Sequence, residues 1–208
     1  MSNLAYLCSS DFDRIYPSFG NPDYDVRDHT VACCVDGVPL LWIALFRPSD
    51  LREADFEVKG PDARTETLHA WAPFALKEKA IDQLKEAIPV LHCVFQGWGT
   101  LDEHAELLEE ALRDAEGSFV TVQLDEAEAL HEEGEFRRRF EHVLRHLAAP
   151  SESDAEARGD FIELACLERE GGFPPADAFL EDTELREEED WNLAHLLGTG
   201  HFRPVPWE

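Results

Sequence analysis

The feature that most constrains the fold is a pair of apolar segments separated by a turn dipeptide. Thr30–Val35 and Val38–Phe46 flank Asp36-Gly37, a dipeptide that suits a two-residue type I′ turn. Pro39 lacks a backbone donor, so it is expected at an edge or at the start of its strand. Trp42 lies in an unbroken apolar run, which indicates burial on both faces. The sequence therefore predicts a β-hairpin here.

Further short strands are expected before and after this hairpin. Phe56–Thr67 is polar and turn-rich, and predicts a loop or a weak hairpin. Strands lead and helices follow, without a repeated βαβ rhythm. The predicted fold class is therefore α+β, a mostly antiparallel sheet with helices packed on one face. The additional strand candidates are Leu4–Cys8, Leu68–Trp71, Ser118–Leu124 and Asp160–Leu167.

Helix signals dominate the middle of the chain. Pro73 suits a first helical turn, and Pro89 should kink or end the helix that follows. Thr100–Glu103 forms a capping box, and Gly117 is placed to end the next helix. Phe136–Leu147 carries the best amphipathic stripe in the chain. These helices are expected to cover the sheet.

The length favours one domain over residues 1–208. Pro150–Gly159 is charged and poor in apolar residues, so it is the predicted mobile linker. Residues 177–208 form an acidic C-terminal segment.

Negative charge is the strongest compositional signal. The chain has 45 acidic and 18 basic residues, a formal net charge of −27. Residues 1–100 hold 15 acids and 9 bases, whereas residues 101–208 hold 30 acids and 9 bases. Such a field repels nucleic acid and anionic membranes and attracts basic partners. General solubility, or adaptation to salt, is the alternative explanation.

The cysteine pattern and the N-terminus point to a reducing compartment. The odd number of cysteines and the absence of a CxxC pair favour free, mostly buried thiols. Met1–Ser10 has no basic region or long apolar run, and Val38–Phe46 is too short to span a bilayer. The expected location is the cytoplasm, with no membrane association. The cysteines are Cys8, Cys33, Cys34, Cys93 and Cys166.

Metal binding is not predicted, although two sequence patterns resemble metal-binding motifs. His142 and His146 have the spacing of helical zinc ligands, but a zinc site needs a third ligand and nearby arginines oppose a cation. A solvated, salt-bridged helix face is the preferred interpretation. Asp23–Asp28 resembles a calcium loop, but Arg27 takes the place of an oxygen ligand, so turn and cap roles are favoured.

Catalysis is not predicted either, and no cofactor is expected. Ser9-Ser10, Cys33 and Cys93 are possible nucleophiles, but none has a base at suitable spacing. A Gly-rich phosphate loop is absent from the sequence. The basic triplet Arg137–Arg139 is surrounded by glutamates, so pairing within the chain is favoured over direct binding of nucleic acid.

Partner binding is the function class that the composition favours. Trp98 lies between two glycines, and Trp191 follows an acidic run. Aromatic side chains among carboxylates suit the recognition of a basic protein. The alternative is that each tryptophan packs inside its own domain. The predicted partner-binding residues are Trp98, Asp177, Glu181, Asp182, Glu184, Glu187, Glu188, Glu189, Asp190 and Trp191.

Two stretches carry a family resemblance. NLAYLCSSDFDRIYPSFGNPDYD (residues 3–25) and VDGVPLLWIALFRP (residues 35–48) look like the start of an uncharacterised family of small acidic bacterial proteins. In size, charge and lack of motifs, the chain is similar to immunity proteins of polymorphic-toxin or type VI secretion systems. The resemblance implies a non-enzymatic inhibitor that occludes the active site of a cognate basic toxin.

Two other functions remain open. An acidic decoy that mimics nucleic acid would inhibit several unrelated nucleic-acid enzymes. An enzyme that reverses a toxin's modification would need a cleft with convergent acids or histidines.

Overall fold

The computed structural model describes residues 4–16, 25–59, 65–95, 101–151, 155–167, 195–200 and 204–207. Its centre is a five-stranded antiparallel sheet in the order β2-β1-β5-β4-β3. The strands are β1 (Leu4–Ser10), β2 (Thr30–Val35), β3 (Leu51–Lys59), β4 (Thr65–Leu76) and β5 (Phe119–Gln123). The predicted α+β class is confirmed.

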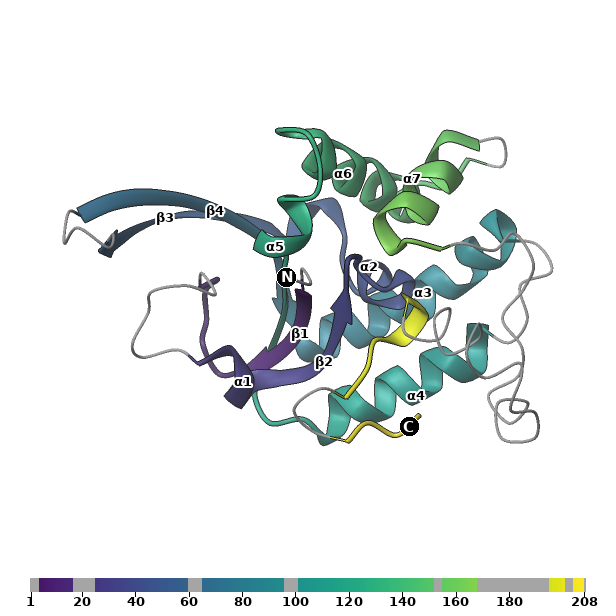
Figure 1. Cartoon of the computed structure of the whole chain (residues 1–208). Helices are drawn as coiled ribbons and strands as arrows, with labels where there is room; N and C mark the ends of the chain where they lie inside the picture. Colours follow the sequence, from purple (N-terminus) through teal and green to yellow (C-terminus); the bar gives the residue numbers. More distant parts are fainter. Residues whose placement is uncertain are drawn as a thin grey trace, which may run out of the picture.

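Most helices lie on one side of the sheet (Figure 1). Alternate sheet residues such as Leu7 and Val122 are fully buried against them, whereas Tyr6 and Cys8 face the opposite side. The helices are α1 (Val26–His29), α2 (Leu40–Ala44), α3 (Lys77–Val94), α4 (Leu101–Asp114), α5 (Asp125–Glu128), α6 (Glu135–Ala148) and α7 (Ala155–Ala165), with a 3₁₀ turn, η1, at Pro48–Asp50.

Only the first strand of the predicted hairpin is present in the structure. Thr30–Val35 forms β2, but the second apolar segment forms α2, whose five residues are all buried. Asp36 has a φ of 61°, in the left-handed region that a tight turn uses. The chain nevertheless leaves the sheet after this residue instead of returning as a second strand. The Val38 amide donates to the Leu164 carbonyl of α7 (2.8 Å). A short run that is apolar on every side does not distinguish a buried strand from a buried helix.

The hairpin that does exist is β3–β4. Its nine cross-strand pairs run from Leu51 opposite Pro73 to Lys59 opposite Thr65. The prediction that Pro73 opens a helix is therefore wrong, since α3 begins at Lys77. Pro89 does not end α3, which continues to Val94. The predicted helices ending near Gly117 and spanning Phe136–Leu147 are confirmed as α4 and α6, and Thr100 lies outside the described residues.

Helix α7 overturns two predictions. Residues 155–159 of the expected linker form its first turns, and Asp160–Leu167 is helical over most of its length rather than a strand. Ala157, Phe161 and Leu164 are buried at helical spacing. Gly159 and the surrounding charges conceal this apolar face in the sequence.

A network of ion pairs and hydrogen bonds connects α7 to α6. The carboxylate of Asp160, 5% exposed, contacts the Arg139 guanidinium (3.3 Å) and Nδ1 of His142 (2.7 Å). Arg139 also pairs with Glu135 and Glu163. The pairing lowers the pKa of the Glu135 carboxyl, mainly through the hydrogen bond from Arg139.

Asp160→Ala should lower the free energy of unfolding by about 1–3 kcal/mol, because two donors lose a buried acceptor. Glu163→Gln removes a carboxylate that is exposed, so a loss below about 1 kcal/mol is expected. Urea denaturation followed by circular dichroism measures both. Equal losses would contradict a special role for the buried carboxylate.

The residues near the C-terminus close the opposite edge of the sheet. Thr199 forms an antiparallel bridge with Cys33 of β2, through amide–carbonyl bonds of 2.9 and 2.7 Å. The indole of Trp42 donates to the Leu197 carbonyl (2.9 Å). The outer edge of β2 is thereby paired at Cys33, whereas β3 is the other edge strand of the described sheet.

Candidate binding site

The partner-binding residues predicted from the sequence all lie outside the described residues. They are Trp98, Asp177, Glu181, Asp182, Glu184, Glu187, Glu188, Glu189, Asp190 and Trp191. The candidate site therefore consists of other residues, and those predictions stay untested.

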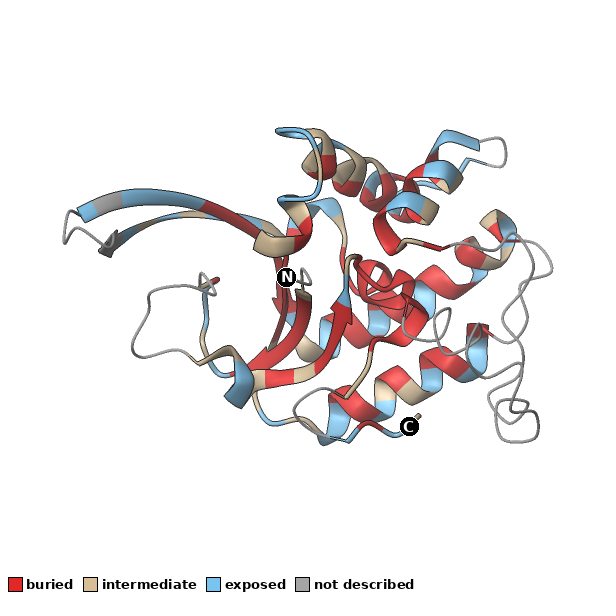
Figure 2. Cartoon of the chain, viewed as in Figure 1, coloured by how far each residue is buried: buried red, intermediate tan, exposed pale blue. Residues whose placement is uncertain are grey.

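The outer part of β3–β4 is a two-stranded arm that leaves the sheet (Figure 1). Strand β4 pairs with β5 only through Phe74–Leu76, whereas it pairs with β3 along residues 65–73. Residues beyond the short β5 contact thus have a partner strand on one side only. Figure 2 shows that the outer arm is mostly exposed, in contrast to the buried sheet.

The base of the arm is anchored on α6. The Trp71 ring packs against Phe136 and Phe140, with ring centroids 6.2 and 5.7 Å away. The Arg137 guanidinium lies 5.4 Å from the Trp71 ring centroid and pairs with Glu53 of β3. This packing stabilises the point from which the arm projects.

One face of the arm is acidic. Glu53, Asp55 and Glu57 alternate along β3 and are exposed, so their side chains share one face. Asp55 accepts a hydrogen bond from Nδ1 of His69 opposite it (2.8 Å). The hydrogen bond from Arg137 lowers the pKa of the Glu53 carboxyl.

The other face of the arm is apolar. Ala54, Phe56 and Leu68 lie on it, and Leu68 is 37% exposed. Near the base this face packs on Ile15 through Ala72 and Phe74 of β4. A two-stranded ribbon has little stability by itself in water, so the uncovered part of this face is suited to a partner.

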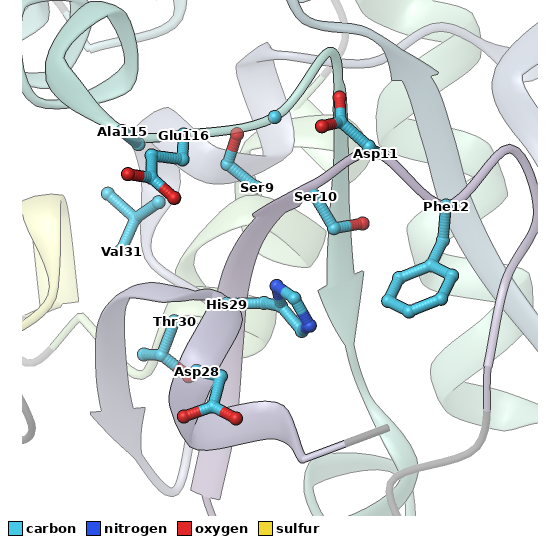
Figure 3. Close-up of a pocket in the computed structure, with 11 residues that line it drawn as sticks. Ser9, Ser10, Asp11, Phe12, Asp28, His29, Thr30, Val31, Ala115 and Glu116 are labelled. Atoms are coloured by element: carbon cyan, nitrogen blue, oxygen red, sulfur yellow. The ribbon is translucent and has the colours of Figure 1, made fainter. Parts of the chain in front are cut away.

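A pocket of about 560 Å³ opens where β1 ends (Figure 3). Three parts of the chain line it: Ser9–Phe12 at the end of β1, Asp28–Val31 at the α1–β2 junction, and Ala115–Gly117 after α4. Figure 3 shows the His29 ring between Ser10 and Asp28. Phe12 meets the His29 ring edge to face, with centroids 5.4 Å apart.

Gly117 permits the close approach that shapes this pocket. Its φ is +96°, and a Cβ atom there would lie 2.4–2.6 Å from the backbone of Ser10. The next residue joins the two segments, since the Ser118 amide donates to the Ser10 carbonyl (3.0 Å) and its hydroxyl donates to Asp11 (2.9 Å). Only glycine fits this position without displacement of β1.

The pocket is acidic, and a hydroxyl buried beside it is unsatisfied. Asp11, Asp28 and Glu116 line it, and its described lining residues include no lysine or arginine. Ser9 is 4% exposed, and its Oγ has no hydrogen-bond partner among the residues that the structure describes. Buried hydroxyls are normally paired, so this atom is a local cost to stability, and it is itself too deeply buried to be open to the pocket.

The pocket and the arm are connected by the segment after β1. Phe12 lines the pocket and packs on Tyr16, with ring centroids 4.8 Å apart. Ile15, three residues on from Phe12, packs against the base of the arm. The Tyr16 carbonyl accepts a hydrogen bond from the Gln123 side chain (2.9 Å). One segment thus extends from the pocket to the arm.

A third grouping could hold a divalent cation. Ligand atoms of His142, Glu156 and Asp160 lie within 4.8 Å of one another, and imidazole with carboxylates suits zinc or manganese. Arg139, on the other Asp160 oxygen, opposes a cation there. His146 takes no part in the grouping and is 5% exposed, so the prediction of a solvated face is wrong for that residue.

The cysteines agree in part with the sequence prediction. None of the five, which all lie within the described residues, forms a disulfide; Cys8, Cys33 and Cys34 are buried, whereas Cys93 is exposed. Burial raises the pKa of the Cys34 thiol, so it stays protonated.

The sequence predicted the arm only in part: a weak hairpin over Phe56–Thr67 and a strand at Leu68–Trp71 were expected, but not strands that extend from Leu51 and to Leu76. Within Leu51–Lys59, acids at 53, 55 and 57 alternate with Ala54 and Phe56, the period of a strand. The pocket has no such signal, because its three segments are distant in sequence and meet through the sheet register.

Comparisons with protein-family models, with curated proteins and with solved structures find no significant match. None of the helices in the described ranges has the length and apolar character that crossing a bilayer requires.

Proposed function

We propose that this protein is a non-enzymatic, cytoplasmic inhibitor of the immunity type, which binds a basic protein partner and occludes its active site. The observation that carries the proposal is the projecting β3–β4 arm, with carboxylates on one face and, on the other, an apolar face that is covered only in part and exposes Leu68.

The shape of the arm suits occlusion. The nine residues of β3 span about 30 Å at the usual rise per residue, and a two-stranded ribbon is narrow enough to enter a cleft. Because β3 is the last strand of the sheet in the part of the chain that the structure describes, its outward backbone groups are suited to pairing with an extended segment of the partner.

The charge of the protein suits a basic partner. A net charge of −27 attracts cationic surfaces over a Debye length and raises the association rate. Asp55 and Glu57 place part of that charge on the projecting element, whereas Glu53 is paired with Arg137. Leu68 and Phe56 on its other face supply apolar contact that slows dissociation.

The test requires the partner as a purified protein. Immobilised full-length protein captures candidates from a lysate of the native source, and the retained basic protein is purified. Association is then followed by stopped-flow fluorescence at increasing salt. We expect the rate constant for association to fall steeply with salt, because opposite charges steer the encounter.

Asp55→Asn/Glu57→Gln should lower that association rate constant about tenfold at low salt, because both charges lie on the arm. The matched control is Glu106→Gln/Glu110→Gln, which removes two exposed charges from α4 and should change the rate less than about twofold. Equal effects of the two variants would contradict a role for the arm. Inhibition of several unrelated nucleic-acid enzymes would indicate a decoy instead.

A further inference from the structure

The backbone groups on the outer edge of β3 can be assigned from the register of the sheet. The Lys77 amide donates to the Ser118 carbonyl (2.8 Å), on the β5 side of β4. Backbone groups point alternately to the two sides of an antiparallel strand. The odd-numbered residues of β4 therefore face β5, and the even-numbered ones face β3. Because Arg52 pairs with Ala72, the even-numbered residues of β3 bond to β4, and the odd-numbered ones direct their amides and carbonyls outward.

Two observations support this assignment. The Pro73 carbonyl accepts a hydrogen bond from Oγ1 of Thr121 in β5 (2.8 Å), so it points to β5. Proline has no amide to donate, and pairing of β4 with β5 accordingly extends no further than Phe74. Asp55 and His69 are opposite each other and meet through their side chains at 2.8 Å. Side chains lie closer in pairs that are not joined by backbone hydrogen bonds, so the Asp55 backbone points outward.

The uncovered part of this edge runs from Glu53 to Glu57. Within the described residues, no group bonds to the amides or carbonyls of residues 53, 55 and 57. The Leu51 carbonyl, in contrast, accepts a hydrogen bond from the Arg52 guanidinium (3.0 Å), which ends the uncovered stretch on that side. An extended segment that lies along Glu53–Glu57 would satisfy these backbone groups by adding a strand to the sheet.

The side chains along this edge specify what kind of segment fits. The carboxylates of Asp55 and Glu57 lie on one face, and Ala54 and Phe56 lie on the other. A side chain of an added strand contacts the side chain opposite it on the same face, and opposite charges stabilise such a pair. The fitting segment therefore has cationic residues opposite the carboxylates and apolar residues between them. A slip by one residue would place apolar groups among the carboxylates.

The other edge of the arm lacks this pattern. The odd-numbered residues of β4 that face away from β3 include Thr67 and His69, and neither is a carboxylate. An antiparallel orientation is expected of the added strand, because every pairing in the sheet is antiparallel and antiparallel pairs are slightly more stable per residue than parallel ones.

We infer that the outer edge of β3 binds an antiparallel strand that carries a cationic side chain at every second position and apolar side chains between them. Resting on the proposed function, this strand is an extended segment of the basic partner.

Hydrogen exchange of the ¹⁵N-labelled full-length protein tests the edge before any ligand is added. The amides of residues 53, 55 and 57 should exchange at least about tenfold faster, relative to their intrinsic rates, than those of residues 54 and 56, which bond to β4. Equal exchange in the two sets would overturn the register. Protection of the odd-numbered amides would mean that the edge is already covered, by a second copy if it depends on concentration and by another segment of this chain if it does not, and either result would overturn the inference.

The probe is the peptide acetyl-Lys-Val-Lys-Val-Lys-amide. At saturation it should slow exchange of the amides of residues 53, 55 and 57 at least about tenfold and leave those of residues 54 and 56 within about twofold. The matched control is acetyl-Lys-Lys-Val-Val-Lys-amide, which has the same composition and charge without the alternation. Equal protection by the two peptides would show attraction by charge alone and would overturn the strand.

Methylation of single peptide nitrogens tests the antiparallel register. In that register the amide of the central lysine donates to the Asp55 carbonyl, whereas the valine amides point away from β3. N-methylation of the central lysine should weaken binding about tenfold, and N-methylation of a valine less than about twofold. The reverse order would overturn the antiparallel pairing, and equal effects would overturn backbone pairing altogether.

Asp55→Pro makes the same test from the side of the protein. Proline at this position removes an outward amide and leaves the ladder with β4 intact, and Asp55→Asn is the control that loses the charge and keeps the amide. Asp55→Pro should bind the alternating peptide about tenfold more weakly than Asp55→Asn. Equal affinities would overturn the pairing. If the arm does not tolerate proline, the methylated peptides decide.

The purified partner separates this inference from the proposed function. In the complex, the amides of residues 53, 55 and 57 should be protected as they are with the peptide, and the peptide should compete with the partner. A basic partner that is inhibited without this protection would overturn the edge site and leave the proposed function standing. A peptide that binds in the stated register, while no basic protein is inhibited, would leave the edge site standing and overturn the partner as the source of the strand.

Discussion

Gly117→Ala is expected to lower the free energy of unfolding by about 3 kcal/mol or more, enough to leave much of the protein insoluble. Two effects combine. At a φ of +96° an alanine costs about 1–2 kcal/mol. Its Cβ would also overlap the Ser10 backbone at 2.4–2.6 Å, which forces β1 away from the turn before β5 and costs a further 1–3 kcal/mol or so.

Gly134→Ala isolates the first of these effects. Gly134 has a φ of +74° and no atom within 4 Å of the added Cβ, so we expect a loss of about 1–2 kcal/mol. Thermal unfolding by circular dichroism and the soluble yield measure both variants. If the two lose the same stability, the close approach of Ser10 is not what requires glycine at position 117.

Trp42→Ala should cost about 3–5 kcal/mol, the usual range for removing a buried tryptophan. Trp42 is fully buried, and its indole donates to the Leu197 carbonyl. Its ring also limits the space at Gly198, where a Cβ would lie 2.4 Å from Cζ2. Loss of the ring therefore removes the support for residues 195–200, and with it the bridge from Thr199 to β2.

Trp42→Phe retains most of the apolar contact and removes the hydrogen bond, so we expect a smaller loss of about 1–3 kcal/mol. Hydrogen exchange of the Cys33 and Thr199 amides reports the bridge directly. Both amides should exchange much faster in Trp42→Ala than in Trp42→Phe. Protection that is equal in the two variants would contradict the support from Trp42.

Elements with a clear hydrophobic periodicity were predicted correctly. The predictions were wrong where local sequence signals conflict with tertiary packing. The spacing of the apolar residues from Phe136 to Leu147 fits the period of a helix, and these residues lie in α6. Val38–Phe46 is apolar on every side, so its period is undefined, and contacts with α7 and residues 195–200 decide in favour of a helix. Pro73 is tolerated in β4, where local propensity favoured the start of a helix.

The candidate site was harder to predict from the sequence than the fold. The carboxylates at 53, 55 and 57 could have been found from their alternation, but their projection depends on β5 pairing with only three residues of β4. The pocket depends on the register that places Ser10 opposite Phe119 and on the left-handed Gly117. Neither property is encoded in a local pattern.

The open edge of β3 also bears on how copies of this protein behave toward one another. An unpaired edge strand is a template for sheet growth between molecules. Two copies that met along β3 would bring Glu53, Asp55 and Glu57 of one against the same carboxylates of the other, and like charges in register repel. Added salt screens this repulsion, so the barrier to edge-to-edge aggregation falls as the ionic strength rises.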